Sequence, residues 1–147
     1  MEIKIKKLYE DSILPTRGSA AAAGYDVYAH LPADIDSVII GPHETVKIGT
    51  GVAIQPPKDT FGAVFARSGL ATKKGLRPAN CVGVCDYDYT GEYIVAIHND
   101  SEDICTIDKG ERIAQVVFIP YINVTFTEAE ELDETERGDG GFGSTGK

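Results

Sequence analysis

Residues 37–66 have the sequence SVIIGPHETVKIGTGVAIQPPKDTFGAVFA, in which short apolar runs alternate with turn-forming clusters. Within it, Thr45–Ile48 alternates polar and apolar side chains, as expected of a strand with one buried and one wetted face. The clusters at 41–42 and 56–59 interrupt the runs with glycine, proline and aspartate, which favour turns. This stretch predicts several short strands rather than long helices.

The same pattern extends over the rest of the chain. The expected strands are Glu2–Tyr9, Tyr25–Ala29, Ser37–Ile40, Thr45–Ile54, Gly62–Ala66, Cys81–Cys85, Tyr93–His98, Ile104–Ile107 and Ile113–Val124. One short helix is expected at Ser68–Lys74, with Ser68 as N-cap and Gly75 as its stop. The run Ala20–Ala23 favours helix but is too short to sustain one. We therefore predict an all-β, jelly-roll-like barrel or sandwich with one short helix.

The length and composition suit one compact globular domain, because the chain has 147 residues, 42% of them apolar and 25% charged. No apolar stretch approaches the roughly 18 to 20 residues of a membrane span. The N-terminal residues MEIKIKKLYE lack the apolar centre of a signal peptide. We expect an intracellular, soluble protein, cytoplasmic or nuclear, with no membrane partner.

The net charge of −9 argues against a nucleic-acid partner, because phosphate backbones select basic surfaces. A small anionic ligand would therefore need a dedicated local site. The three cysteines, Cys81, Cys85 and Cys105, form an odd set that is not typical of a disulfide framework. No histidine pair lies near Cys81 and Cys85 to complete a zinc site, so small buried apolar residues are expected there.

The C-terminal segment differs in kind from the rest. From Thr127 the chain is acidic, and residues 137–147 are RGDGGFGSTGK. This composition predicts a flexible, glycine-rich arm over 127–147 that follows a β core over 1–126. A tail without function is one interpretation. In the other, Arg137 pairs with a phosphate, Phe142 covers a base and the glycines allow close backbone approach.

The final residues GFGSTGK superficially match the phosphate-loop pattern. A phosphate loop follows a strand and opens a helix, whereas Lys147 ends this chain and no helix can follow. We reject that interpretation.

Two internal segments carry further candidate groups. In Ala66–Leu70 (ARSGL), backbone amides, the Ser68 hydroxyl and the Arg67 guanidinium could converge on an anion, although a simple strand-to-helix cap explains the same residues. In 80–92, two expected strands flank a turn with two carboxylates and two phenols. A surface hairpin is the plain explanation. Alternatively, one carboxylate holds and deprotonates a water.

Taken together in chain order, five segments resemble the ordered motifs of the trimeric dUTPase family. They are AAGYD at 22–26, ARSGL at 66–70, GVCDYDYTGE at 83–92, GERIAQ at 110–115 and RGDGGFGSTG at 137–146. The resemblance spans nearly the whole chain. It implies hydrolysis of dUTP to dUMP and pyrophosphate, which limits uracil incorporation into DNA and supplies dUMP for thymidylate synthesis. It also implies Mg²⁺ as cofactor and a homotrimer with sites shared between subunits.

The resemblance assigns the central roles as follows. Asp86 is the base that activates the water attacking the α-phosphorus. Tyr89 packs under the deoxyribose and leaves no space for a 2′-hydroxyl. Asn80 and the backbone from Gly83 read uracil, and Asp26 binds Mg²⁺ through water.

The remaining implied roles concern the phosphates and the closing arm. Arg67, Ser68, Gly69 and Gln115 hold the phosphate chain. The arm contributes Arg137, Phe142, Gly143, Ser144 and Thr145, with Phe142 stacked on uracil. In the trimer, motifs one, two and four come from one chain, motif three from a second and the arm from a third.

The sequence departs from the usual family pattern at three positions. Ala66 stands where many relatives have proline, Cys85 replaces a larger aliphatic residue, and Tyr87 replaces something smaller. Two alternatives stay open: a dCTP deaminase, which shares this fold and releases ammonia, and a sensor that binds dUTP without hydrolysing it.

Overall fold

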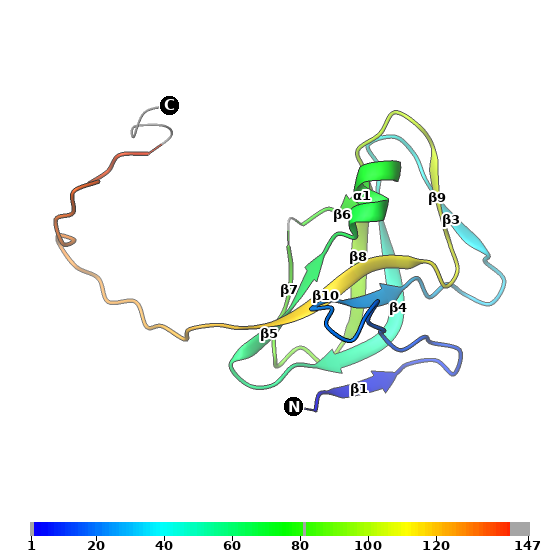
Figure 1. Cartoon of the computed structure of the whole chain (residues 1–147), viewed down its shortest axis with the longest axis horizontal. Coiled ribbons are helices and arrows are strands. Elements are labelled where there is room, and N and C mark those ends of the chain that lie inside the picture. Colours follow the sequence, from blue (N-terminus) through cyan, green and yellow to red (C-terminus); the bar gives the residue numbers. More distant parts are fainter. Residues whose placement is uncertain (1, 81, 142–147) are drawn as a thin grey trace.

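The computed structural model describes residues 2–80 and 82–141, which form two four-stranded sheets, a two-stranded ribbon and one helix (Figure 1). The elements are β1 (Lys4–Lys7), β2 (Tyr25–Tyr28), β3 (Ser37–Ile40), β4 (Thr45–Gln55), β5 (Thr60–Phe65), α1 (Ser68–Lys74), β6 (Leu76–Pro78), β7 (Gly83–Cys85), β8 (Glu92–Asn99), β9 (Cys105–Asp108) and β10 (Arg112–Pro120).

The sheets join strands that are distant in sequence. One sheet has the order β1-β4-β8-β6, the second has β2-β10-β5-β7, and the ribbon pairs β3 with β9. The two large sheets share one hydrophobic core, to which β4 and β8 contribute Ile48 and Val95 while β5 and β10 contribute Val64 and Val116. Burial of each such side chain contributes roughly 1.5–3 kcal/mol to the free energy of folding. The expected all-β, jelly-roll architecture with one short helix is confirmed.

The helix begins and ends at the expected residues, but its N-terminal cap differs from the prediction. Arg67, not Ser68, is the N-cap, since its backbone is extended (φ −90°, ψ 128°) and Ser68 is already helical. No side chain caps this end. Gly75 ends the helix in the left-handed conformation (φ 66°), where its N–H donates to Leu70 O. Ala20–Ala23 is not helical, as expected.

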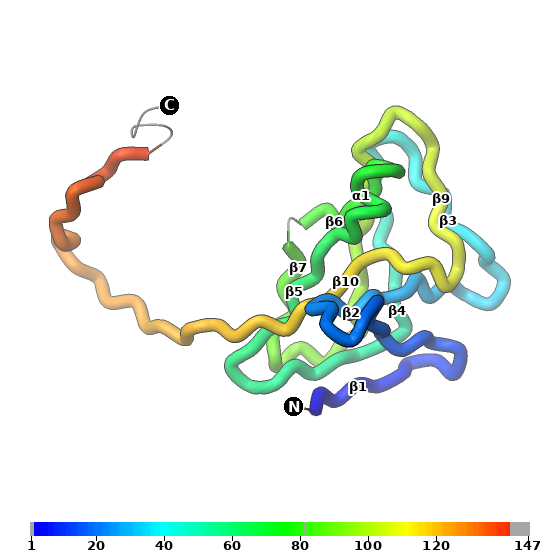
Figure 2. The backbone as a smooth tube through the Cα atoms, in the orientation of Figure 1, coloured from blue at the N-terminus to red at the C-terminus, as the bar shows by residue number. Residues whose placement is uncertain are grey.

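Three strands differ most from the sequence-based expectation. β1 spans only Lys4–Lys7, where Glu2–Tyr9 was expected. β6 was not expected, because three residues ending in proline carry no measurable alternation. β10 ends at Pro120 rather than at Val124. Beyond it, residues 121–141 contain no helix or strand, and they lead away from both sheets (Figure 2). Residues 121–139 of this segment are exposed. The proposed division between core and arm at residue 126 stays a prediction.

Of the cysteines, Cys85 and Cys105 are free and lie half-buried against the core, while Cys81 falls outside the described residues. In the described ranges, no helix has the length and apolar character needed to cross a membrane.

Candidate active site

A pocket of about 250 Å³ lies beside β7 and β8 and brings together four of the residues that the sequence singled out. We call it the Asp86 pocket. The residues that line it are Val64, Asn80, Gly83, Val84, Cys85, Asp86, Tyr89, Glu92, Tyr93, Ile94 and Val95. β7 reaches this position because it pairs with β5, with Gly83 opposite Val64. The predicted grouping of Asn80, Gly83, Asp86 and Tyr89 in space is thus observed.

Glycine at position 83 permits a close approach of two strands and a side-chain amide. A Cβ there would lie 3.0 Å from Val64 Cβ and 3.1 Å from Asn80 Nδ2. Both distances are tighter than ordinary van der Waals contact. The Asn80 amide therefore lies against bare backbone, so that amide, N–H and C=O groups can present a combined hydrogen-bonding edge to a planar base.

The turn between β7 and β8 fixes Asp86 relative to Tyr89. The Tyr89 N–H donates to Asp86 O at 3.1 Å, which closes a four-residue turn with aspartate at its favoured first position. The Tyr89 hydroxyl donates to Glu92 O at 2.8 Å, and 43% of the residue remains exposed. The turn thus presents an exposed carboxylate and a fixed aromatic ring to the same pocket.

Beneath this turn, two ionisable groups are held neutral. Burial raises the pKa of the Cys85 thiol, and burial also raises the pKa of Tyr93. Tyr93 is only 2% exposed, and its hydroxyl forms no hydrogen bond of normal geometry. These two groups therefore add no charge to the pocket, where Glu92 accepts from the Gly51 N–H and Asp86 is the exposed carboxylate.

A second group of predicted residues lies on β2, β10 and the start of α1. We call Asp26, Arg67, Arg112 and Gln115 the Asp26 cluster. Asp26 Oδ1 accepts from Arg67 Nε at 2.8 Å, and Asp26 Oδ2 accepts from an Arg112 guanidinium nitrogen at 3.1 Å. Gln115 donates to Ala66 O at 2.9 Å. The side chain of Asp26 is 14% exposed, that of Arg67 24% and that of Arg112 49%.

Strand register explains how this cluster forms. On β10, Gln115 lies opposite Asp26 of β2 and opposite Phe65 of β5, two residues before Arg67. Gly24 lies directly against the Gln115 side chain, where a Cβ would overlap its amide oxygen. Ser68 and Gly69 follow Arg67, and Gly69 borders open space. Two guanidinium groups and an amide therefore gather at one surface that suits a polyphosphate, and Ser68 adjoins it in the chain.

Sequence reasoning missed Arg112 as part of this cluster. It lies in the GERIAQ segment, where only Gln115 was assigned a role, and its partner Asp26 is 86 positions away. One indication of its role is present in the sequence: a basic residue stands directly before an expected apolar strand, within a segment that resembles a family motif.

Of the arm residues with an expected role, only Arg137 lies among the described residues, and it is not brought to either group within one chain. Arg137 lies in the exposed tail, where its Nε donates to Gly140 O at 2.7 Å. Phe142, Gly143, Ser144 and Thr145 lie outside the described residues. No residue lining the Asp86 pocket belongs to the Asp26 cluster.

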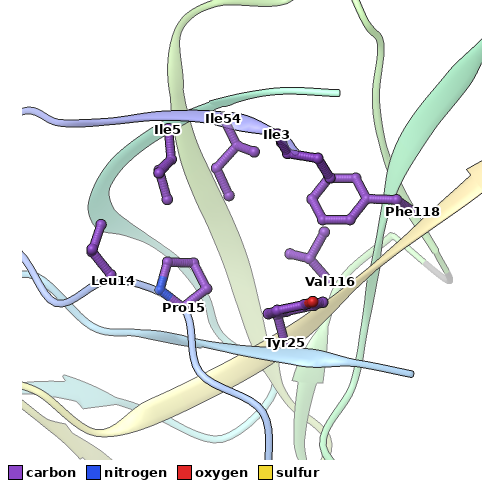
Figure 3. A pocket seen from close by; sticks show the side chains of 8 residues that line it. All are labelled: Ile3, Ile5, Leu14, Pro15, Tyr25, Ile54, Val116 and Phe118. Carbon is purple, nitrogen blue, oxygen red and sulfur yellow. The ribbon is translucent and has the colours of Figure 1, made fainter. Parts of the chain in front are cut away.

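Another pocket, of about 280 Å³, has a different character (Figure 3). Its side chains come from β1 and the residue before it, from β2, β4 and β10, and from the segment before β2. They are Ile3, Ile5, Leu14, Pro15, Tyr25, Ile54, Val116 and Phe118. It offers no carboxylate, imidazole or cationic group, so it is not suited to hydrolysis.

The donor groups for a metal are sparse in the described part of the chain. Residues 2–80 and 82–141 contain no cluster of three or more histidine, cysteine, aspartate or glutamate side chains arranged to hold an ion. In the Asp26 cluster the single carboxylate already accepts from two arginines. Any ion here would draw most of its ligands from water or substrate.

Comparison with known proteins identifies the family to which this arrangement belongs. The family model of the dUTPases matches residues 10–146. The chain belongs to the dUTPase family. A relative from Hydrogenobaculum sp. (strain Y04AAS1), named deoxyuridine 5′-triphosphate nucleotidohydrolase, is 45% identical over 99% of both chains. The enzyme therefore hydrolyses dUTP to dUMP.

Solved structures agree with the fold of the enzyme. It resembles the dUTPase of Staphylococcus bacteriophage 80alpha, a G164S mutant with bound dUpNHpp, at a TM-score of 0.86 and 28% identity, covering 99% of both chains. It also resembles a mutant dUTPase from phage phi11 of S. aureus (TM-score 0.78, 23% identity, covering 91% of this chain and 100% of that one). In that phage protein a structural Mg(II) ion is coordinated.

Proposed function

We propose that Asp86 is the general base of dUTP hydrolysis and that it acts on a water aimed at the α-phosphorus. The water's oxygen forms a bond to that phosphorus, its proton passes to the Asp86 carboxylate, and the bond from the α-phosphorus to the bridging oxygen breaks to release pyrophosphate. A positioned carboxylate of this kind contributes roughly 10²–10⁴-fold. The observation that carries the proposal is the Asp86 pocket, which places one exposed carboxylate beside a base-reading edge and an aromatic ring.

In this assignment, the Asp86 pocket holds the nucleoside. Asn80 and the backbone at Gly83 hydrogen-bond the uracil edge, where the absence of a Gly83 side chain lets the Asn80 amide lie against the backbone. Tyr89 packs against the deoxyribose with its exposed face. A 2′-hydroxyl would meet this ring without a hydrogen-bonding partner, which disfavours UTP.

The Asp26 cluster holds the triphosphate. Arg67, Ser68, Gly69 and Gln115 supply the contacts, and Arg112 adds a second guanidinium. Guanidinium groups bind phosphate oxygens in strong, charge-assisted pairs. These local positive charges outweigh the net charge of −9, which otherwise repels an anionic substrate.

We propose that Mg²⁺ acts as cofactor and is held by Asp26 through water. A lone carboxylate that already accepts from two arginines fits an ion whose inner ligands are mainly waters and substrate oxygens. When bound, the ion neutralises phosphate charge and fixes the phosphate conformation. Asp26 would then hold the hydrated ion, while Arg67 and Arg112 turn from Asp26 to the phosphate oxygens.

We further propose a homotrimer in which each site combines chains. One chain supplies the Asp26 cluster, a second supplies the Asp86 pocket, and a third contributes Arg137, Phe142, Gly143, Ser144 and Thr145 from its arm. Two observations support this: no residue is shared between the two groups within one chain, and apolar side chains border the pocket at the surface. Val84 is 59% exposed and Ile94 is 54% exposed.

The role of Asp86 is tested by Asp86→Asn, with Asp88→Asn as the matched control in the same turn. We expect Asp86→Asn to lower kcat for pyrophosphate release by at least about 10²-fold, since the carboxylate that accepts the proton is lost. Its affinity for dUTP should persist in equilibrium titration, and Asp88→Asn should behave like the wild type. Near-normal turnover in Asp86→Asn would remove this residue from the role.

A further inference from the structure

A local irregularity in β4 lies beside the Asp86 pocket. Opposite β8, Gly49 pairs with Ile94 and Ala53 pairs with Glu92, so β4 advances four residues where β8 advances two. Such bulges bend a strand and redirect its side chains. The stretch between these pairs, residues 50–52, is anchored to β8 by side-chain hydrogen bonds rather than by regular pairing.

Two hydrogen bonds form these anchors. Thr50 Oγ1 donates to Tyr93 O at 2.7 Å, and the Gly51 N–H donates to Glu92 Oε1 at 2.7 Å. Gly51 has a φ of +69°, a conformation that side-chain-bearing residues rarely adopt. The Glu92 carboxylate therefore satisfies a backbone N–H that the bulge has removed from the strand ladder.

Gly49 makes the space that this carboxylate occupies. A Cβ at position 49 would lie 2.5 Å from Glu92 Oε1, closer than any real contact allows. The segment Gly49-Thr50-Gly51 is thus shaped around one side chain of the neighbouring strand. Glu92 was quoted within the GVCDYDYTGE motif, but neither the motif nor the sequence gave it a role.

The same residue holds the aromatic ring of the pocket. The Tyr89 hydroxyl donates to the backbone oxygen of Glu92 at 2.8 Å. The ring lies over Gly91, where a Cβ would come within 2.6 Å of the Tyr89 hydroxyl oxygen. The Tyr89 N–H in turn donates to Asp86 O at 3.1 Å. A continuous path of contacts therefore runs from the β4 bulge through Glu92 and Tyr89 to Asp86.

We propose that the Glu92 carboxylate is a positioning residue that sets the height and tilt of the Tyr89 ring against the sugar. By fastening β8 to the β4 bulge, it fixes the backbone oxygen to which the Tyr89 hydroxyl is bonded. The inference rests on the proposed contact between Tyr89 and the deoxyribose. It adds that discrimination between dUTP and UTP depends on a carboxylate that does not touch the nucleotide.

The experiment compares Glu92→Ala with Glu92→Gln, which keeps an oxygen that can accept from Gly51 N–H. Steady-state pyrophosphate release is measured with dUTP and with UTP in saturating Mg²⁺, and Tm is recorded. For Glu92→Ala we expect the ratio of kcat/KM for dUTP over UTP to fall about three- to tenfold, on the scale of one hydrogen bond. The loss should appear mainly in the KM for dUTP. Glu92→Gln should restore the ratio.

Gly49→Ala provides a second route, because its methyl group displaces the carboxylate without changing Glu92. Gly49→Ala should lower the same ratio of kcat/KM values, and it keeps the inference testable if Glu92→Ala does not fold. Tyr89→Ala is the reference that removes the ring, and it should lower the ratio most.

Three results would overturn the inference. Equal losses for dUTP and UTP in Glu92→Ala, with a lowered Tm, would make the residue merely structural. A ratio as low in Glu92→Gln as in Glu92→Ala would exclude the Gly51 hydrogen bond as the cause. If Tyr89→Ala left the ratio unchanged, the proposed sugar contact itself would be wrong, which separates that failure from a failure of Glu92 alone.

Discussion

The Asp86 pocket and the Asp26 cluster are built in opposite ways. Apart from Val64, the pocket takes its lining from residues 80–95, a single strand-turn-strand segment. The cluster joins residues that are 41 and 86 positions apart in the chain. The pocket contains an unpaired hydroxyl and an exposed carboxylate, whereas the charges of the cluster are already matched with one another.

This difference has a functional consequence. A rigid local turn can present hydrogen-bonding groups and a ring at fixed positions, which suits recognition of a base and a sugar. A cluster of paired charges can instead exchange partners when an anion arrives, so that Arg67 and Arg112 turn from Asp26 to phosphate. We therefore expect changes in the pocket to alter selectivity and changes in the cluster to alter affinity.

Apart from the loss of the Asp86 carboxylate itself, the largest effect should come from removing the arm, which belongs to neither region. Deletion of residues 137–147 should leave a folded oligomer but lower kcat/KM by about 10²-fold, the scale of losing a preorganised contact to the reacting phosphates. Charge-neutralising changes at Glu130 and Glu134 in the same tail serve as the control and should keep activity. An unchanged kcat/KM in the deletion would contradict the role of the arm.

Within the cluster, Arg67→Ala should raise the KM for dUTP about tenfold or more, because a charge-assisted pair to phosphate is worth roughly 1.5–3 kcal/mol. Arg112→Ala should have a smaller effect, since its side chain is 49% exposed against 24% for Arg67. Neither change should alter the ratio of dUTP to UTP turnover. A change of that ratio in either variant would contradict the proposal that the pocket sets selectivity and the cluster sets affinity.

In the pocket, Tyr93→Phe should increase the free energy of unfolding by about 1 kcal/mol, because it removes a buried hydroxyl that has no partner. Gly62→Ala should destabilise the wild type, since its Cβ would lie 2.7 Å from that hydroxyl. Adding Tyr93→Phe should relieve part of the loss. Chemical denaturation of the wild type, the two single variants and the double variant measures the coupling between the two positions. Strictly additive effects on the free energy of unfolding would contradict it.

The smallest effect concerns an ion-pair network remote from both regions. Hydrogen bonds from His30 and Lys109 lower the pKa of Asp11 to about 2. A depressed carboxyl pKa contributes stability that is present above the unfolded pKa of about 3.9 and is lost as pH falls toward 2. In Asp11→Asn, Tm should therefore vary less with pH between about 4 and 2. An unchanged pH dependence would show that this carboxylate makes no contribution.

The same contrast explains how well the sequence predicted each region. Asn80, Gly83, Asp86 and Tyr89 could be grouped in advance because they lie within ten residues of one another around a turn. Arg112 could not, because its proximity to Asp26 depends on the pairing of β2 with β10. Local patterns specify turns and strands, while strand register is decided by packing across the whole core.

The strand and helix predictions show the same limit. The alternation of polar and apolar side chains predicted β4 and β8 well, since long strands repeat this pattern several times. β6 has three residues and no repeat, and the end of β10 is set by which residues find a partner strand. Ser68 was expected as N-cap from its residue type, but the extended backbone at Arg67 places the N-cap one residue earlier.

The most direct test of the account is complementation between two impaired variants, Asp86→Asn and Arg67→Ala, assayed with dUTP well below the wild-type KM. If the pocket of one chain works with the cluster of another, mixed oligomers formed by co-refolding contain sites with both groups intact, roughly a quarter of all sites under random pairing. The account predicts that the mixture releases pyrophosphate from dUTP well above the sum of the separate variants. A mixture no more active than that sum would contradict it.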